Sequence, residues 1–301
     1  MSKPLQVIVI GLGSAGDVHP NVGLALALRE RGHEVLLAAP SVFQSLGEHA
    51  GLEFAAILSD DEYHAAIRDP NLWHPFRSLS VVARRLILPT LRPVYQIIEK
   101  HWEPGRTVIA APGFAFGARI AQEKLGVPLA TVHLQPIMFR SAIQPGCFGF
   151  PDILGHLLRP LRRLYLRATD QFLIDPLVAD ETNSFRLELR LPPVRRLFNG
   201  WVHSPQLIIG LFPEVCDART RLAFQRCAYR VSTLGRKQFA KSLTWVGRIS
   251  SSRTLADRVH CGFSHGTGRI LFPSIGRGVP NLWPTRTLFD AVFWATSDAP
   301  S

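Results

Sequence analysis

The chain has 301 residues, enough for one large domain or two ordinary ones. No apolar run is long enough to cross a bilayer, residues 5–11 are too short for a signal peptide, and the four cysteines have neither metal-ligand nor disulfide-framework spacing. The formal net charge is +11, of which residues 214–301 carry +8, from thirteen Lys and Arg against five Asp and Glu. The missing apolar spans and the cysteine spacing predict a cytoplasmic protein with no bound metal. Because the charge excess lies in one tail without a nucleic-acid-binding motif, we predict no nucleic-acid partner.

The first sixty residues alternate between apolar strands and amphipathic helices. Residues 7–10 are four β-branched apolar residues, which predicts a strand buried on both faces. A helix is expected at 20–31, with Pro20 in its first turn. Strands are then predicted at 34–39 and 54–58, on either side of a helix at 40–49. Such a series implies parallel strands joined by right-handed crossovers.

The same alternation continues to about residue 212. Residues 59–76 are polar and turn-rich, and a long helical stretch follows at 78–102, which Pro89 and Pro93 should kink or split. Further strands are predicted at 107–111, 129–133 and 206–212, and further helices at 114–125 and 156–189. The pattern predicts an α/β fold with a Rossmann-like doubly wound parallel sheet, in one domain at 1–213.

The pattern ends near Val215. Residues 214–301 are rich in arginine, hold three of the four cysteines and show no sustained helical or strand periodicity. We therefore predict an irregular, poorly ordered basic tail in place of a second folded domain.

The turn after the first strand carries the most informative residues. Gly11-x-Gly13-x-x-Gly16 matches the dinucleotide-binding fingerprint, so a nucleotide-dependent oxidoreductase is one hypothesis. That fingerprint also requires an acidic residue at the end of the second strand, for the ribose hydroxyl. Here the second strand ends Leu37-Ala38-Ala39-Pro40, without a carboxylate. Asp17 and His19 instead follow the first strand directly, at the edge where open α/β sheets place their chemistry.

A longer pattern is more specific than the glycines alone. Gly13-Ser14-x-Gly16-Asp17-x-x-Pro20 is followed by Gly23-Leu24-Ala25 and Arg31-Gly32-His33-Glu34-Val35. Later segments of the pattern are Phe116-Gly117-Ala118-Arg119-Ile120-Ala121, Gly126-Val127-Pro128 and Thr131-Val132-His133-Leu134-Gln135-Pro136. Together these segments resemble the N-terminal domain of GT-B glycosyltransferases of family 28, in the sterol and antibiotic glucosyltransferase branch, over roughly the first two-thirds of the chain. The resemblance implies sugar transfer from a nucleotide sugar, such as a UDP-sugar, to an acceptor hydroxyl. It also implies that this domain binds the acceptor and that a second domain binds the donor.

The resemblance places a catalytic base on Asp17, because sugar transfer needs a base beside the acceptor hydroxyl as it attacks the anomeric carbon. Asp17 could equally stabilise the start of a helix, and the two roles are compatible. His19 is a second candidate base, since imidazole titrates near neutrality. The residues expected at the substrate are Gly13, Ser14, Gly16, His133 and Gln135. For His133, a buried and hydrogen-bonded structural role is the alternative.

Apolar side chains in the loops suit a lipid-like or polyketide acceptor. The aromatic candidates are Trp73, Phe76, Phe139, Phe148 and Phe150, each of which could instead pack in the core. Residues 156–167 set leucines against arginines in a basic amphipathic helix. That helix either packs on the sheet or rests on an anionic membrane, which would give a peripheral membrane contact.

The codons of the tail suggest a further hypothesis. Read with the last two bases of each codon and the first base of the next, residues 215–233 can give F-A-T-P-x-P-D-W-P-S-N-x-x-L-T-G-F-P-L, which resembles the family's interdomain linker. Residues 257–264 can give I-V-F-T-A-G-S-A, which resembles the first strand and turn of the donor domain. We therefore hypothesise a frame shift near residue 214 and little or no activity in this chain. The alternatives are an acceptor-binding module of a split glycosyltransferase and a non-functional gene product.

Overall fold

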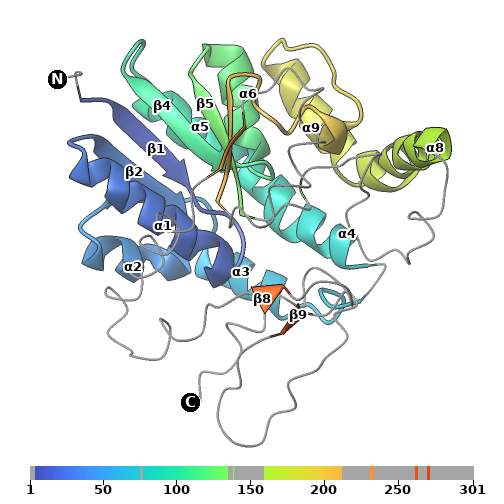
Figure 1. The fold of residues 1–301 in the computed structure, drawn as a ribbon, viewed down its shortest axis with the longest axis horizontal. Coiled ribbons are helices and arrows are strands. Elements are labelled where there is room, and N and C mark those ends of the chain that lie inside the picture. The colour runs from blue at the N-terminus through green and yellow to red at the C-terminus, as the bar shows by residue number, and fades with distance from the viewer. Residues whose placement is uncertain are drawn as a thin grey trace, which may run out of the picture.

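The computed structural model describes residues 4–74, 77–134, 138 and 159–211, together with short strands at 231–233, 262–263 and 270–271. Its centre is a parallel sheet with the strand order β3-β2-β1-β4-β5-β6-β7 (Figure 1). The strands are β1 Gln6–Ile10, β2 Glu34–Ala39, β3 Glu53–Ala56, β4 Thr107–Pro112, β5 Leu129–His133, β6 Leu207–Gly210 and β7 Val231–Thr233. A separate antiparallel pair consists of β8 Gly262–Phe263 and β9 Ile270–Leu271. The order confirms the predicted Rossmann-like sheet, and β7 adds an edge strand from within the tail.

Helices cover both faces of this sheet. They are α1 Ala15–Glu30, η1 Ser41–Phe43, α2 Gln44–His49, α3 Asp60–Ile67, α4 Ser78–Val82, η2 Ala83–Ile87, α5 Leu88–His101, α6 Phe116–Leu125, α8 Arg159–Thr169, η4 Asp170–Ile174, α9 Asp175–Glu188 and η5 Leu197–Asn199. On β1, Val7 and Val9 belong to the apolar cluster that includes α1, whereas Ile8 and Ile10 belong to the cluster that includes α5. Both faces of β1 are therefore buried, which confirms the doubly wound architecture.

The first helix begins earlier than predicted. α1 starts at Ala15, so Pro20 lies inside the helix and the placement of Pro20 in the first turn was wrong. The reason is local: hydrogen bonds between Ser14 and Asp17 fix the helix start at the end of the glycine turn. Pro20 has no N–H to donate to the carbonyl of the preceding turn, and the helix continues past this missing bond.

A short helix lies within the segment that was predicted to consist of polar turns. α3 follows Ser59, whose backbone N–H and hydroxyl both donate to the carboxylate of Glu62, at 2.9 and 2.7 Å. This Ser-x-x-Glu arrangement is a capping box, a sequence signal for a helix start. The capping box was visible in the sequence, and it identifies α3.

The long helical stretch is continuous from Ser78 to His101 but changes its geometry before Pro89. Residues 83–87 form a π-helical turn, η2, between α4 and α5. Pro89 lies at the start of α5 and Pro93 inside it, so the predicted interruption occurs at the π turn.

The backbones of α5 and α6 meet at Gly117. A Cβ at this position would overlap the carbonyl oxygen of Leu91 and lie 2.9 Å from the backbone nitrogen of Tyr95. Gly117→Ala is therefore expected to lower the free energy of unfolding by about 1–3 kcal/mol, because helix backbone cannot move aside as a side-chain end can. Urea denaturation measures the change. Gly47→Ala is the matched control, since its Cβ would meet side-chain atoms of Phe54 and Leu37, and equal losses in the two variants would contradict the argument.

Candidate functional site

The turn between β1 and α1 lies at the carboxyl edge of the sheet. Gly13 has a φ of +122°, in the region that favours glycine, and a Cβ there would overlap the carboxylate of Asp17. Ser14 is buried beside it, whereas Gly16 is exposed. The glycine at position 13 therefore allows the Asp17 side chain to fold back over the turn.

The Asp17 carboxylate is fixed by Ser14. Its Oδ2 accepts the backbone N–H of Ser14 at 2.8 Å and the Ser14 hydroxyl at 2.9 Å. Asp17 also lies in the first turn of α1, where the helix dipole favours a negative charge. The helix-stabilising role that the sequence left open is thus present, and the role of Asp17 as a base stays a prediction.

The environment of Asp17 favours its protonated form. Burial raises its pKa from 3.8 to about 6, although the hydrogen bonds from the Ser14 side chain and backbone act in the opposite direction. A carboxylate whose pKa lies close to neutral pH is still ionised at pH 7 and is a better proton acceptor than an ordinary one. A carboxylate with this pKa can accept a proton from a hydroxyl group at neutral pH.

This raised pKa predicts a pH-dependent stability. The unfolded state loses the Asp17 proton at a lower pH than the folded state, so this contribution to stability is complete below about pH 4 and is lost as the pH rises through about 6. Asp17→Asn should remove this dependence. The change that it causes in the free energy of unfolding should be more favourable at pH 8 than at pH 4, by at most about 3 kcal/mol. Urea denaturation of both proteins from pH 4 to pH 8 tests this, and parallel pH profiles would contradict it.

His19 lies on the next part of α1 and faces aromatic residues. Its ring meets that of Phe43 edge to face, with 6.4 Å between the ring centroids. Burial lowers its pKa from 6.5, and its Nδ1 is a buried atom with no hydrogen-bond partner among the described residues. A neutral imidazole of lowered pKa is a weaker base than the sequence suggested for His19.

Tyr63 is a site residue that the sequence analysis missed. It is buried, lies on α3, and contacts Phe43 edge to face with 5.6 Å between the ring centroids. Its pKa is raised to about 12, mainly by burial and further by the negative charge of Asp17. α3 therefore brings a protonated phenol close enough to Asp17 to feel its charge, and recognition of the Ser59–Glu62 capping box would have identified the helix that carries it.

His133 ends β5 at the same edge of the sheet and is buried. Its Nε2 is hydrogen-bonded to Nδ1 of His203 at 3.0 Å, and a Cβ at Gly113 would lie 3.0 Å from its ring. Burial, with a smaller effect of His203, lowers the pKa of His133 well below 6.5, and burial lowers that of His203 to about 4. Both imidazoles are therefore neutral at physiological pH, an arrangement typical of a structural pair, and substrate contact by His133 stays a prediction.

Five of the predicted residues lie close together in the chain, in the turn after β1 and the first part of α1: Gly13, Ser14, Gly16, Asp17 and His19. His133 belongs to β5, which is separated from β1 by β4, so the two strands lie about 10 Å apart across the sheet. Gln135, Phe76, Phe139, Phe148 and Phe150 lie outside the described residues, and Trp73 is exposed after α3. No cluster of three or more potential metal ligands occurs in the described part of the chain.

The fold is a Rossmann-like domain in which the turn with Ser14 and Asp17 lies at the carboxyl end of β1. Residues 7–143 match the glycosyltransferase family 28 N-terminal domain. This stretch of the chain is therefore similar to the N-terminal domain of family 28 glycosyltransferases. The match decides against the oxidoreductase hypothesis, in agreement with the absence of an acidic residue at the end of β2.

Three relatives are similar to parts of this chain. It is 45% identical over 58 residues to O-mycaminosyltylonolide 6-deoxyallosyltransferase of Streptomyces fradiae, covering 19% of this chain and 14% of the relative. It is 25% identical to dTDP-epi-vancosaminyltransferase of Amycolatopsis orientalis, covering 67% of this chain and 45% of the relative. It is 26% identical to a sterol 3-beta-glucosyltransferase of Arabidopsis thaliana, covering 68% and 34%. The matched region thus spans less than half the length of each of these relatives.

Proposed function

We propose that residues 4–211 form the acceptor-side domain of a glycosyltransferase that moves a sugar from a nucleotide sugar to a hydroxyl of a lipid-like or secondary-metabolite acceptor. The observation that carries this proposal is the Asp17 carboxylate, held by Ser14 at the carboxyl end of β1 with a pKa of about 6. In the proposed reaction Asp17 takes the proton of the acceptor hydroxyl as that oxygen attacks the anomeric carbon. The nucleoside diphosphate leaves from the opposite face of the sugar, and no metal takes part.

The apolar character of the acceptor is supported by the surroundings of Asp17. Phe43 and Tyr63 form an aromatic contact beside the turn, and His19 adds its ring to Phe43. Aromatic side chains are common at sites that bind apolar small molecules. The names of the relatives agree with such acceptors, since one is a sterol glucosyltransferase.

The donor-binding domain is proposed to be encoded by the codons of the tail, in another reading frame. Residues 214–301 would be an out-of-frame translation, and deletion of one base near codon 215 would join the acceptor domain to the linker and donor strand described above. The chain of 301 residues should then show little or no transfer, and limited proteolysis should remove its tail back to about Phe212. The competing proposal is a module that works with a separate donor-binding subunit, which a co-purifying partner that restores transfer would favour.

The experiment has two parts. Sequencing codons 205–301 should show one continuous shifted frame with the linker and donor-domain pattern, and a shifted frame broken by stop codons would overturn the frame hypothesis. The frame-joined chain should then transfer sugar from nucleotide sugars to sterol or polyketide acceptors, whereas the 301-residue chain should not. Absence of nucleotide-sugar turnover by the joined chain across such a panel would overturn the proposed function.

A peripheral membrane contact is supported by one surface. α8 and η4 expose Leu161, Leu164 and Phe172, of which Phe172 is 75% exposed, and their spacing places them along one helical face. Arginines lie in the same segment, a composition that suits an anionic lipid surface on the cytoplasmic side. No helix in the described ranges is long and apolar enough to span a bilayer. Sedimentation with anionic but not zwitterionic vesicles, weakened by Leu164→Gln with Phe172→Gln, is the expected result.

A further inference from the structure

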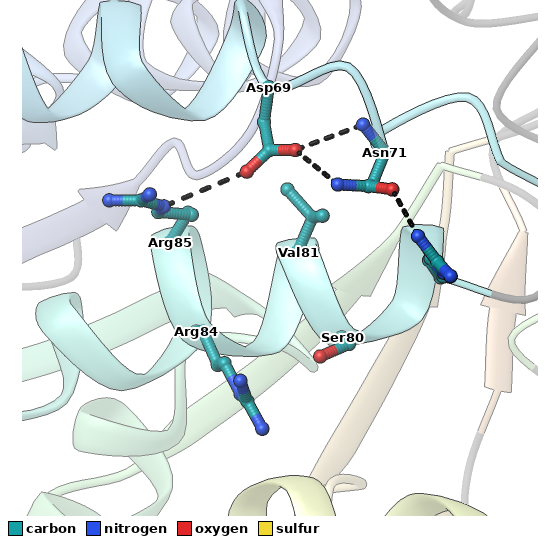
Figure 2. Close-up of a pocket in the computed structure, with 7 residues that line it drawn as sticks. Asp69, Asn71, Ser80, Val81, Arg84 and Arg85 are labelled. Carbon is teal, nitrogen blue, oxygen red and sulfur yellow. Dashed lines mark hydrogen bonds and ion pairs between the residues drawn. The ribbon is translucent and has the colours of Figure 1, made fainter.

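An arginine-lined cavity lies where the turn after α3 meets the start of the long helix. It has a volume of about 360 Å³ and is lined by Asp69, Asn71, Arg77, Ser80, Val81, Arg84 and Arg85 (Figure 2). None of the residues of the β1–α1 turn contributes to it. The lining positions 77, 80, 81, 84 and 85 recur every three or four residues, so one side of the helix builds most of the cavity.

The cavity lining has an excess of positive charge. Three arginines and one aspartate line it, and the carboxylate of that aspartate is already engaged: Asp69 Oδ1 accepts the backbone N–H and the side-chain amide of Asn71, at 2.9 and 3.3 Å. Arg85 Nε lies 3.9 Å from Asp69 Oδ2, the outer limit for an ion pair, and Arg77 donates to the neutral Asn71 side chain at 3.3 Å. Arg84 has no ion pair with any described residue. The seven side chains therefore carry a net charge of about +2.

The cavity lies toward the carboxyl edge of the sheet, the edge that carries Asp17, although α5 and α1 cover opposite faces of the sheet. The helical stretch from Ser78 to His101 is about 36 Å long at 1.5 Å per residue, whereas a strand of five or six residues spans about 20 Å. α5 ends shortly before β4 begins, at the amino edge, so the start of α4 extends past the carboxyl edge. Figure 1 shows α4 on the side toward which β1 points. The π turn η2, a feature often found at functional sites, lies within this projecting part and carries Arg84 and Arg85.

We propose that Arg77, Arg84 and Arg85 bind an anionic group of the acceptor, a phosphate or a carboxylate, while its hydroxyl lies at Asp17. Guanidinium groups bind both anions through paired, charge-assisted hydrogen bonds, and the Ser80 hydroxyl supplies one further donor. The cavity is large enough for such a group. The identification of the ligand as an acceptor rests on the proposed function, whereas the anion site itself rests only on these residues.

Calorimetric titration of the 301-residue chain tests the site without requiring sugar transfer. Inorganic pyrophosphate and citrate are titrated separately at constant ionic strength, into the native chain and into the Arg84→Gln and Arg77→Gln/Arg85→Gln variants. At least a tenfold weaker binding in both variants is expected, with unchanged circular dichroism. Arg31→Gln, an exposed arginine at the end of α1, is the matched control and should bind as the native chain does.

The two anions distinguish the acceptor classes. Tighter binding of pyrophosphate assigns a phosphate-bearing acceptor, and tighter binding of citrate assigns a carboxylate-bearing one. Equal weakening by Arg31→Gln, or no binding of either anion at millimolar concentration, would overturn the anion site. Failure of the frame-joined chain to transfer sugar would leave these binding results unchanged, so the two proposals fail separately.

Discussion

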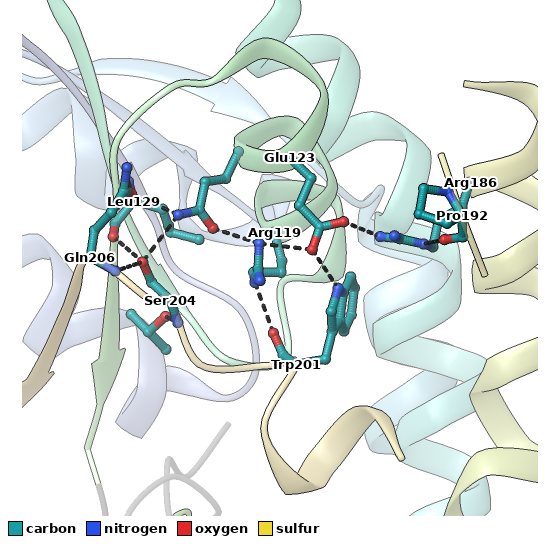
Figure 3. A network of polar contacts seen from close by, with 10 residues as sticks. Arg119, Glu123, Leu129, Arg186, Pro192, Trp201, Ser204 and Gln206 are labelled. Atoms are coloured by element: carbon teal, nitrogen blue, oxygen red, sulfur yellow. Dashed lines mark hydrogen bonds and ion pairs between the residues drawn. The ribbon is translucent and has the colours of Figure 1, made fainter. Parts of the chain in front are cut away.

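Replacing Glu123 with glutamine is expected to lower the free energy of unfolding by about 3–5 kcal/mol, because it removes the charge that compensates a buried arginine. Arg186 on α9 is only 2% exposed, and its guanidinium forms an ion pair with Glu123 of α6. Glu123 also pairs with Arg119 at 3.0 Å and accepts the indole N–H of Trp201 at 2.9 Å (Figure 3). One carboxylate therefore joins α6, α9 and the segment that leads into β6.

The rest of the network cannot replace this charge. Arg186 donates from its Nε to the carbonyl of Pro192 at 2.8 Å, and Arg119 donates from its Nε to the carbonyl of Trp201 at 2.8 Å. Both of these acceptors are neutral, so in the Glu123→Gln variant the buried guanidinium group of Arg186 would lose the carboxylate with which it pairs. An unpaired buried charge is costly because the interior solvates it poorly.

An exposed ion pair provides the matched control. Arg92 and Glu188 join α5 to α9 through two hydrogen bonds, but their side chains are 42% and 52% exposed. Glu188→Gln should lower the free energy of unfolding far less than Glu123→Gln does, since water solvates either charge when its partner is removed. Urea denaturation of both variants measures the difference. Similar losses would mean that the buried network is not what holds α9 to α6.

The strands were the part of the fold that the sequence predicted best, and the reason is physical. A parallel strand covered on both faces needs a continuous apolar run, so β2 and β5 were predicted with the bounds that the structure has. Helix starts were predicted less well, because they depend on a few hydrogen bonds such as those between Ser14 and Asp17. Pro20 led the sequence analysis to predict a later start for α1, whereas the hydrogen bonds between Ser14 and Asp17 start the helix at Ala15.

Contacts between distant segments could not be predicted from local pattern. Arg186 would be assigned to the exposed face of a helix, and its burial depends on Glu123, 63 positions away in the sequence. The same holds for the candidate site: Asp17 and its turn were predictable from a local motif, whereas the approach of Tyr63 depends on how α3 packs. The pairing of His133 with His203 likewise joins residues 70 positions apart.

Asp17→Asn should lower the rate of sugar transfer by the frame-joined chain by about 10²–10⁴-fold, the usual contribution of a general base. The amide keeps an oxygen that can accept from Ser14, so the turn and the start of α1 should persist, but it cannot take the acceptor's proton. His19→Gln is the matched control on the same helix. Its effect should stay below about tenfold, because burial already lowers the pKa of His19 and weakens it as a base.

The stability of the same variant separates the two roles of Asp17. If Asp17 only stabilised the helix start, Asp17→Asn would lower stability by about 1 kcal/mol and leave transfer nearly unchanged. If Asp17 is a base with a raised pKa, Asp17→Asn should instead abolish most of the transfer and leave stability at pH 8 unchanged or higher. The reason is that ionised Asp17 lowers stability at pH 8, whereas the neutral amide does not. Loss of transfer together with unchanged or higher stability at pH 8 is the expected outcome, measured by donor turnover and urea denaturation on one preparation. A large loss in His19→Gln with full activity in Asp17→Asn would instead assign the base to His19.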